Sequence, residues 1–205
     1  MNGFMKFISG VFHPLLLSTY MMCILYVLSP EIFGSIGVQQ IPILILAIAL
    51  TTVVFPAMVI GAMKVFSSKV SSYELTQREE RIMPFISITI FYGATTYMFI
   101  TEFRVTPVLS TMLLIVTSLI LSLLIITFWF KISIHASANW SVAGVLTYLA
   151  IKQGDIFLTP LIIWILIAGL VSTSRLYQGF HSPKEVWIGT TYGYLYALAG
   201  MLFLD

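Results

Sequence analysis

Charged residues are scarce in this sequence. Asp, Glu, Lys and Arg together make up 9% of its 205 residues, whereas 59% are hydrophobic. A soluble domain of this length cannot hide so much apolar surface, so the chain is predicted to be an integral membrane protein. Several long apolar runs favour helices over a barrel, because a helix satisfies its own backbone hydrogen bonds in lipid.

Other features are missing as well. A net charge of +2 is too small to indicate a nucleic-acid partner. Cys23 is the single cysteine, which excludes an internal disulfide. The N-terminal region has no Ala-x-Ala cleavage site, and its apolar run is too long for the core of a signal peptide, so we interpret it as a retained span. An Asp/His cluster typical of a metal site is absent from the sequence, and no metal is expected.

Seven apolar spans are predicted, within a range of six to eight. They cover about residues 14–28, 41–63, 83–101, 107–130, 131–151, 157–172 and 186–204. The expected fold is all-α, a polytopic transmembrane helical bundle formed by residues 1–205 as a single domain. Pro56 is expected to kink the second span. Small residues in the fifth span, such as Ala136 and Ser137, predict close packing against another helix.

Three polar stretches interrupt these spans, at residues 71–84, 131–140 and 174–185. Ionisable groups at the edge of a membrane segment are costly to keep, so they indicate a functional site. Two spans separate the first stretch from the second, and two more separate the second from the third. An even number of crossings returns the chain to the same membrane face, so one active site at one interface is predicted.

The third stretch combines three chemical roles. Arg175 can clamp phosphate oxygens, His181 can act as a nucleophile, and Glu185 can orient that histidine. A simpler interpretation is a helix start, with Ser182 as N-cap, Pro183 at the first helical position and Glu185 closing a capping box. That interpretation explains neither Arg175 nor His181. Both can hold together, because a helix N-terminus favours a bound phosphate.

Other polar residues have weaker signals. Arg78 and Arg81 are three residues apart, so on a helix they share a face and form a plausible phosphate fork. A solvated loop or an interfacial helix is the alternative for that stretch. Lys131 follows Trp129 as an interface anchor would. His13 is a lone histidine at the start of the first span, where a structural role is expected.

The third stretch resembles a motif of the type 2 phosphatidic acid phosphatase family, integral membrane enzymes that act on lipid phosphates and diphosphates. The family motif reads Ser-Arg-x5-His-x3-Asp. This chain has Ser174, Arg175, His181 and Glu185 at those positions, with glutamate in place of aspartate. Among the family's three motifs this is the best match, and it is fairly specific.

The other two motifs are partial. The family's Pro-Ser-Gly-His is similar to Ser133–His135, which has Ile134 for glycine and no proline before the serine. For Lys-x6-Arg-Pro, Arg81 and Pro84 are close but not adjacent, and Glu74 stands where the lysine would be. The order and separation of the three stretches strengthen the combined match.

The resemblance implies a mechanism. His181 would be the nucleophile that forms a phosphohistidine, and Glu185 would orient it. His135 would protonate the leaving group and then activate water. The implied phosphate-binding residues are Arg175, Arg81, Arg78, Ser133, Lys131 and Ser174, with Arg78 as a stand-in for the missing lysine. The family needs no metal, and no cofactor is expected.

The expected function is hydrolysis of a lipid phosphate or diphosphate. Phosphatidic acid, phosphatidylglycerol phosphate, a polyprenyl diphosphate and a phosphorylated lipid A all stay open, and the expected partners are this substrate and membrane lipids. One alternative is a transporter or channel, which predicts ionisable groups in mid-span, whereas here they lie at span ends. A catalytically inactive relative that serves as a scaffold is another.

A bacterial inner membrane is the expected location. The resemblance places the site on the side away from the cytoplasm. The distribution of Lys and Arg favours the cytoplasmic side instead, although several of these positive residues would be substrate ligands.

Overall fold

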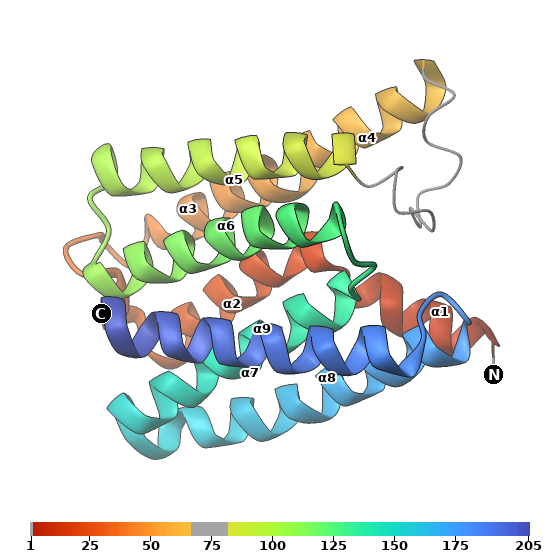
Figure 1. Ribbon diagram of the computed structural model, residues 1–205. Coiled ribbons are helices and arrows are strands. Elements are labelled where there is room, and N and C mark those ends of the chain that lie inside the picture. Colours follow the sequence, from red (N-terminus) through yellow and green to blue (C-terminus); the bar gives the residue numbers. More distant parts are fainter. Residues whose placement is uncertain (1, 67–81) are drawn as a thin grey trace.

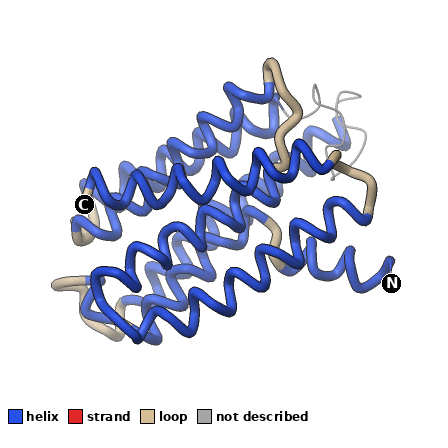
Figure 2. The backbone as a smooth tube through the Cα atoms, turned by 60° about the horizontal axis from the view of Figure 1, so that its bottom comes forward, coloured by secondary structure: helices blue, strands red, loops and turns tan. Residues whose placement is uncertain are grey.

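A computed structural model describes residues 2–66 and 82–205, and all regular structure in these residues is helical (Figures 1 and 2). The predicted all-α fold is confirmed. The helices are α1 (Asn2–Val11), α2 (Pro14–Leu28), α3 (Ile41–Ala49), α4 (Phe55–Phe66), α5 (Ile82–Thr101), α6 (Pro107–Thr127), α7 (Ile134–Gln153), α8 (Leu158–Tyr177) and α9 (Pro183–Leu204). Short 3₁₀ turns cover Pro30–Phe33 and Gly154–Phe157, and a π-helical turn covers Leu50–Val54.

Each predicted span overlaps one of these helices or, for residues 41–63, the α3–α4 pair. By length and composition, four helical segments of the described chain are able to cross a membrane. Counting the pair α1–α2, which is bent by 60°, as one span raises the number to five. One of the four segments, residues 134–177, consists of α7 and α8, which lie side by side and run in opposite directions (Figure 1). The protein is therefore a helical integral membrane protein.

The distortion expected near Pro56 takes the form of the π-helical turn before α4. Proline has no N–H to donate to the carbonyl of Thr52, four residues earlier, and its ring crowds that carbonyl. A wider turn relieves this crowding. The hydroxyl of Thr52 bonds to the carbonyl of Ile48 at 2.7 Å, so the threonine side chain is satisfied within the helix.

The backbones of α7 and α9 approach each other closely because glycines face the contact. A Cβ atom added at Gly193 would lie 2.0 Å from the carbonyl oxygen of Ser137, and one at Gly189 would lie 2.8 Å from that of Ser133. The close packing predicted from the small residues of the fifth span is confirmed, and its partner is α9. Small residues serve this purpose in membranes, where helix association depends on van der Waals contact.

The same end of the bundle holds the beginnings of α2, α7 and α9 and the end of α8, on the right in Figure 1. The second and third polar stretches therefore meet at one end, as the even number of spans predicted. α5 also begins at this end. Residues 71–81 of the first polar stretch, which include Arg78 and Arg81, lie outside the described residues.

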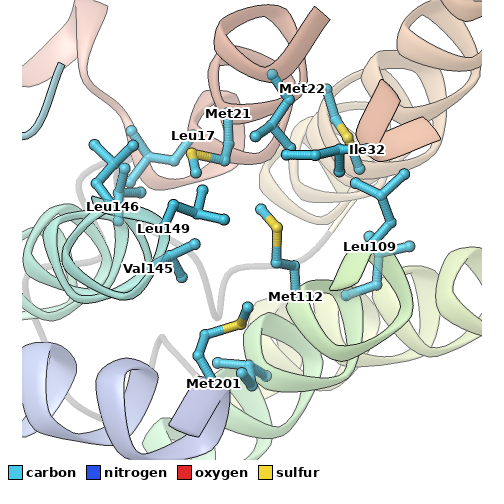
Figure 3. Packing of buried hydrophobic residues seen from close by; sticks show 14 of the residues in the cluster. Leu17, Met21, Met22, Ile32, Leu109, Met112, Val145, Leu146, Leu149 and Met201 are labelled. Carbon is cyan, nitrogen blue, oxygen red and sulfur yellow. The ribbon is translucent and has the colours of Figure 1, made fainter. Parts of the chain in front are cut away.

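The main hydrophobic core lies where α2, α6, α7 and α9 meet. Figure 3 shows methionine and aliphatic side chains from all four helices pointing into this region. Met21 and Met22 come from α2, Met112 from α6, Val145 from α7 and Met201 from α9. Methionine is unbranched and flexible, so this part of the core adapts its shape more easily than one built from branched residues.

The glycine contact generates a stability prediction. Gly193→Ala places a methyl group against the backbone of Ser137, and overpacking of this kind costs about 1–3 kcal/mol. Gly169→Ala in α8 is the matched control: it is also mid-helix, but its Cβ meets nothing within 4 Å. Since alanine favours a helix over glycine by about 0.5–1 kcal/mol, the control is expected to raise the Tm in detergent while Gly193→Ala lowers it. Equal Tm values would contradict the tight contact.

Candidate active site

A short turn connects α8 to α9 and brings an aromatic ring onto an arginine. Gly179 has φ 70°, a left-handed conformation that glycine adopts without strain, and the chain reverses there. The Phe180 ring then lies 4.5 Å from the guanidinium carbon of Arg175, which belongs to the last turn of α8. Arg175 is only 2% exposed. The stacked ring holds a planar cation in a defined orientation, as bidentate binding of an oxyanion requires.

His181 and Glu185 are in direct contact. The Nδ1 atom of His181 lies 2.6 Å from Oε2 of Glu185, one turn further along the chain. A carboxylate only accepts hydrogen bonds, so Nδ1–H is the donor and the neutral ring carries its lone pair on Nε2. The same Oε2 accepts the backbone N–H of Ser182 at 3.4 Å, and Ser182 Oγ accepts the N–H of Glu185. The capping box and the histidine–carboxylate pair therefore exist together.

His135 lies in the first turn of α7, next to the start of α9. The backbone N–H of Ser133, the N-cap of α7, donates to the carbonyl of Glu185 at 3.3 Å and so holds the two helix starts together. Ser133 is fully buried, and its hydroxyl has no hydrogen-bond partner among the described residues. The positive ends of two helix dipoles converge here, which favours an anion.

His13 belongs to this group as well. It is the N-cap of α2, and its Nδ1 accepts the N–H of Leu15 at 3.3 Å. The cap agrees with the structural role expected from the sequence. In addition, its ring lies edge to face with that of His135, with centroids 5.0 Å apart, and it lines the same pocket. The sequence prediction missed this proximity. Four predicted spans separate the two histidines, so the rule of even crossings places both at the same membrane face, although it does not predict the contact between their rings.

A buried amide fixes the two histidine-bearing segments to each other. The Nδ2 atom of Asn139 donates to the carbonyl of Phe12 at 3.1 Å and to that of His135 at 2.9 Å. The indole N–H of Trp164 bonds to the carbonyl of Asn139 at 3.1 Å, which adds α8 to the same unit. The break between α1 and α2 is thus held against the first turn of α7.

One pocket connects these polar groups to the apolar interior. It holds about 1390 Å³ of space outside the protein atoms, its open mouth included. Its head is lined by His13, His135, Arg175 and His181. From His135 it extends along α7 to Val145, ten residues or about 15 Å further. The walls come mostly from α2, α5, α6 and α7, with single residues from α4 and α9, and are mainly aliphatic. A ligand with an anionic head and an apolar tail fits this arrangement.

The remaining predicted site residues are placed differently. The hydroxyl of Ser174 bonds to the carbonyl of Met5 at 2.7 Å and to the hydroxyl of Ser9 at 2.8 Å, so it docks α1 onto α8. It lies outside the pocket lining, and so does the half-buried Lys131. Within residues 2–66 and 82–205, no three His, Cys, Asp or Glu side chains are grouped as a metal site requires.

Fold and pocket define a class of protein: a helical membrane protein with a basic, histidine-bearing site at the head of an apolar pocket. Residues 126–205 match the family model described as the PAP2 superfamily, and this match supports membership of that superfamily. Members of that superfamily are generally phosphatases that act on phosphate esters, so the match supports a phosphatase. The matched part contains α7, α8 and α9. A search of the curated proteins and a search of the solved structures found no match.

The hydrogen bonds of Ser174 generate the next prediction. Ser174→Ala removes the hydroxyl that holds α1 and leaves its partners buried without this hydrogen bond. We expect the free energy of unfolding to fall by about 1–3 kcal/mol, and the Tm to fall with it. The affinity for inorganic phosphate, measured by titration calorimetry, is expected to stay unchanged. Thr173→Ala is the control, because this adjacent hydroxyl bonds only within α8, to Gly169. A loss of phosphate affinity specific to Ser174→Ala would make the serine a phosphate ligand instead.

Proposed function

We propose that the protein hydrolyses a lipid phosphate or diphosphate through a phosphohistidine intermediate. The observation that carries this proposal is the single pocket that joins His135, Arg175 and His181 to the apolar interior. The phosphate of the substrate would bind among these three side chains. Its hydrocarbon chain would extend between α2, α5, α6 and α7, towards the flexible methionines.

In the first step, Nε2 of His181 attacks phosphorus. The N–P bond forms as the bond between phosphorus and the leaving oxygen breaks, and protonated His135 gives its proton to that oxygen. Glu185 accepts the hydrogen bond from Nδ1–H throughout, at 2.6 Å in the resting protein. Its negative charge stabilises the positive charge that develops on the attacking ring.

In the second step, water attacks the phosphohistidine. His135, now neutral, takes a proton from the water, the N–P bond breaks, and inorganic phosphate leaves with His181 restored. Phosphoryl transfer of this type depends on positioning and on positive charge near the phosphoryl oxygens. The close contact of α7 and α9 supplies the positioning, because it sets the spacing between the two histidines.

Several groups are proposed to hold the phosphoryl oxygens. Arg175 is the strongest candidate, since it is shielded from solvent, stacks on Phe180 and lines the pocket. The buried hydroxyl of Ser133 stays another proposed donor, although Ser133 is not among the residues that line the pocket. Arg78, Arg81 and Lys131 stay proposed ligands on the strength of the sequence. Ser174 is proposed to act through its docking of α1.

The whole chain is proposed to act as one unit, because the walls of the pocket come from both sides of residue 126. The substrate candidates are phosphatidic acid, phosphatidylglycerol phosphate, a polyprenyl diphosphate and a lipid A type phosphate. A site facing away from the cytoplasm of a bacterial inner membrane is part of the same proposal.

Release of inorganic phosphate by detergent-solubilised protein tests the function, with these four lipids as substrates. Glu185→Gln sharpens the test, because glutamine also serves in a capping box and is expected to keep the start of α9 folded. It removes the charge beside His181, so turnover is expected to fall roughly 10³-fold at unchanged Tm. Turnover near that of the wild type would reduce Glu185 to a capping residue. A folded wild type that releases no phosphate from any of the lipids would refute the phosphatase proposal.

The roles of the two histidines predict different behaviour with different leaving groups. His181→Ala is expected to abolish both phosphoenzyme formation and turnover with every substrate. His135→Ala is expected to hydrolyse a lipid monophosphate hardly at all, because a lipid alkoxide needs a proton to leave. With p-nitrophenyl phosphate, whose leaving group needs none, the same variant is expected to form a phosphoenzyme that accumulates.

Rapid quench at alkaline pH, where phosphohistidine survives, measures these species for both variants and both substrates. An acid-labile adduct in His181→Ala would exclude this histidine as the nucleophile. Equal losses on both substrates in His135→Ala would exclude His135 as the general acid.

A further inference from the structure

Three histidines in the described chain share one structural setting. Each lies at the start of a helix that points its N-terminus at the pocket: His13 at α2, His135 at α7 and His181 at α9. All three line the pocket. The proposed reaction uses His135 and His181 and leaves His13 without a chemical role.

The hydrogen bond at its Nδ1 determines which atom His13 presents. Nδ1 accepts the N–H of Leu15, so the proton of the neutral ring is on Nε2. Nε2–H is a hydrogen-bond donor. The hydrogen bond accepted at Nδ1 polarises the ring and makes Nε2–H a stronger donor. A neutral imidazole at a helix N-terminus is suited to act as such a donor towards a reacting oxygen.

We propose that His13 is a substrate-contacting residue that donates a hydrogen bond from Nε2–H to a phosphoryl oxygen, beside Arg175. This inference rests on the proposed function, because it assigns a ligand to the phosphoryl group that His181 attacks. A neutral donor is well suited to this position. Its ring is 5.0 Å from that of His135, which must itself carry a proton in the first step, and a second cation there would disfavour that proton.

The position of the donor is rigid. Asn139 bonds to the carbonyl of Phe12, the residue before His13, and to the carbonyl of His135 itself. The cap at Leu15 fixes the ring from the other side. His13 and His135 therefore keep their relative positions when a ligand arrives. A donor held in place before the reaction contributes more to the transition state than one that must be ordered during it.

Two substitutions separate the cap from the donor. His13→Asn keeps the N-cap, because the asparagine oxygen accepts a backbone N–H as Nδ1 does, but its side chain is too short to replace Nε2–H. His13→Gln places an amide N–H near the position of Nε2 and is a poorer cap. The expected result for His13→Asn is an unchanged Tm with kcat/KM on a lipid phosphate lowered roughly 10²-fold. His13→Gln is expected to recover part of this loss despite a lower Tm.

A binding measurement makes the two proposals separable. Titration calorimetry with inorganic phosphate is expected to show about tenfold weaker binding to His13→Asn than to the wild type, a loss of about 1.4 kcal/mol. If His13→Asn has the same turnover and the same phosphate affinity as the wild type, the inference is overturned and His13 is only a cap. A turnover loss in both variants at unchanged phosphate affinity would also overturn it, since the ring would then act only by packing on His135.

Failure of the proposed function looks different. A wild type that binds inorganic phosphate through His13 yet releases none from any lipid phosphate would refute the phosphatase proposal and keep His13 as an anion ligand. A wild type that neither binds phosphate nor releases it would overturn both.

Discussion

The close contact between α7 and α9 is the constraint on which the site depends. Since Gly189 and Gly193 carry no side chains, the two backbones approach until the N–H of Ser133 reaches the carbonyl of Glu185. This contact sets the beginnings of both helices side by side, and with them His135 and His181. In a membrane the hydrophobic effect does not press helices together, so such a contact requires small residues along its length.

Several side chains of the site also determine where a helix begins. Glu185 closes the capping box of α9 with the same oxygen that contacts His181. His13 caps α2 and lines the pocket with the same ring. Because helix geometry and site geometry share atoms, the caps themselves help to hold the polar head of the pocket in place, together with the clamp at Asn139. A substitution that loosens a helix start is for the same reason expected to move a site residue.

The two ends of the pocket have different origins in the chain. His135, Arg175 and His181 all belong to the part that matches the PAP2 superfamily, whereas α2 and α5, and nearly all of α6, precede it. In the proposed reaction, the nucleophile and the general acid therefore come from the matched part, His13 joins them from the N-terminal side, and the surface that receives the lipid chain comes largely from the preceding helices. Substitutions at the Met21 and Met112 end of the pocket are the natural place to look for substrate preference.

Apart from α1, the positions of the helices could be read from the sequence because lipid requires helices wherever an apolar run is long enough. Counting spans placed the histidine stretches at one end, and His181 pairs with Glu185 because residues four apart share a helix face. Which way a side chain points across helices could not be read in this way. Ser174 faces α1 and not the pocket, and His13 meets His135, because the bend between α1 and α2 and the clamp at Asn139 decide those contacts. Such contacts between distant segments depend on how whole helices pack, which no local pattern records.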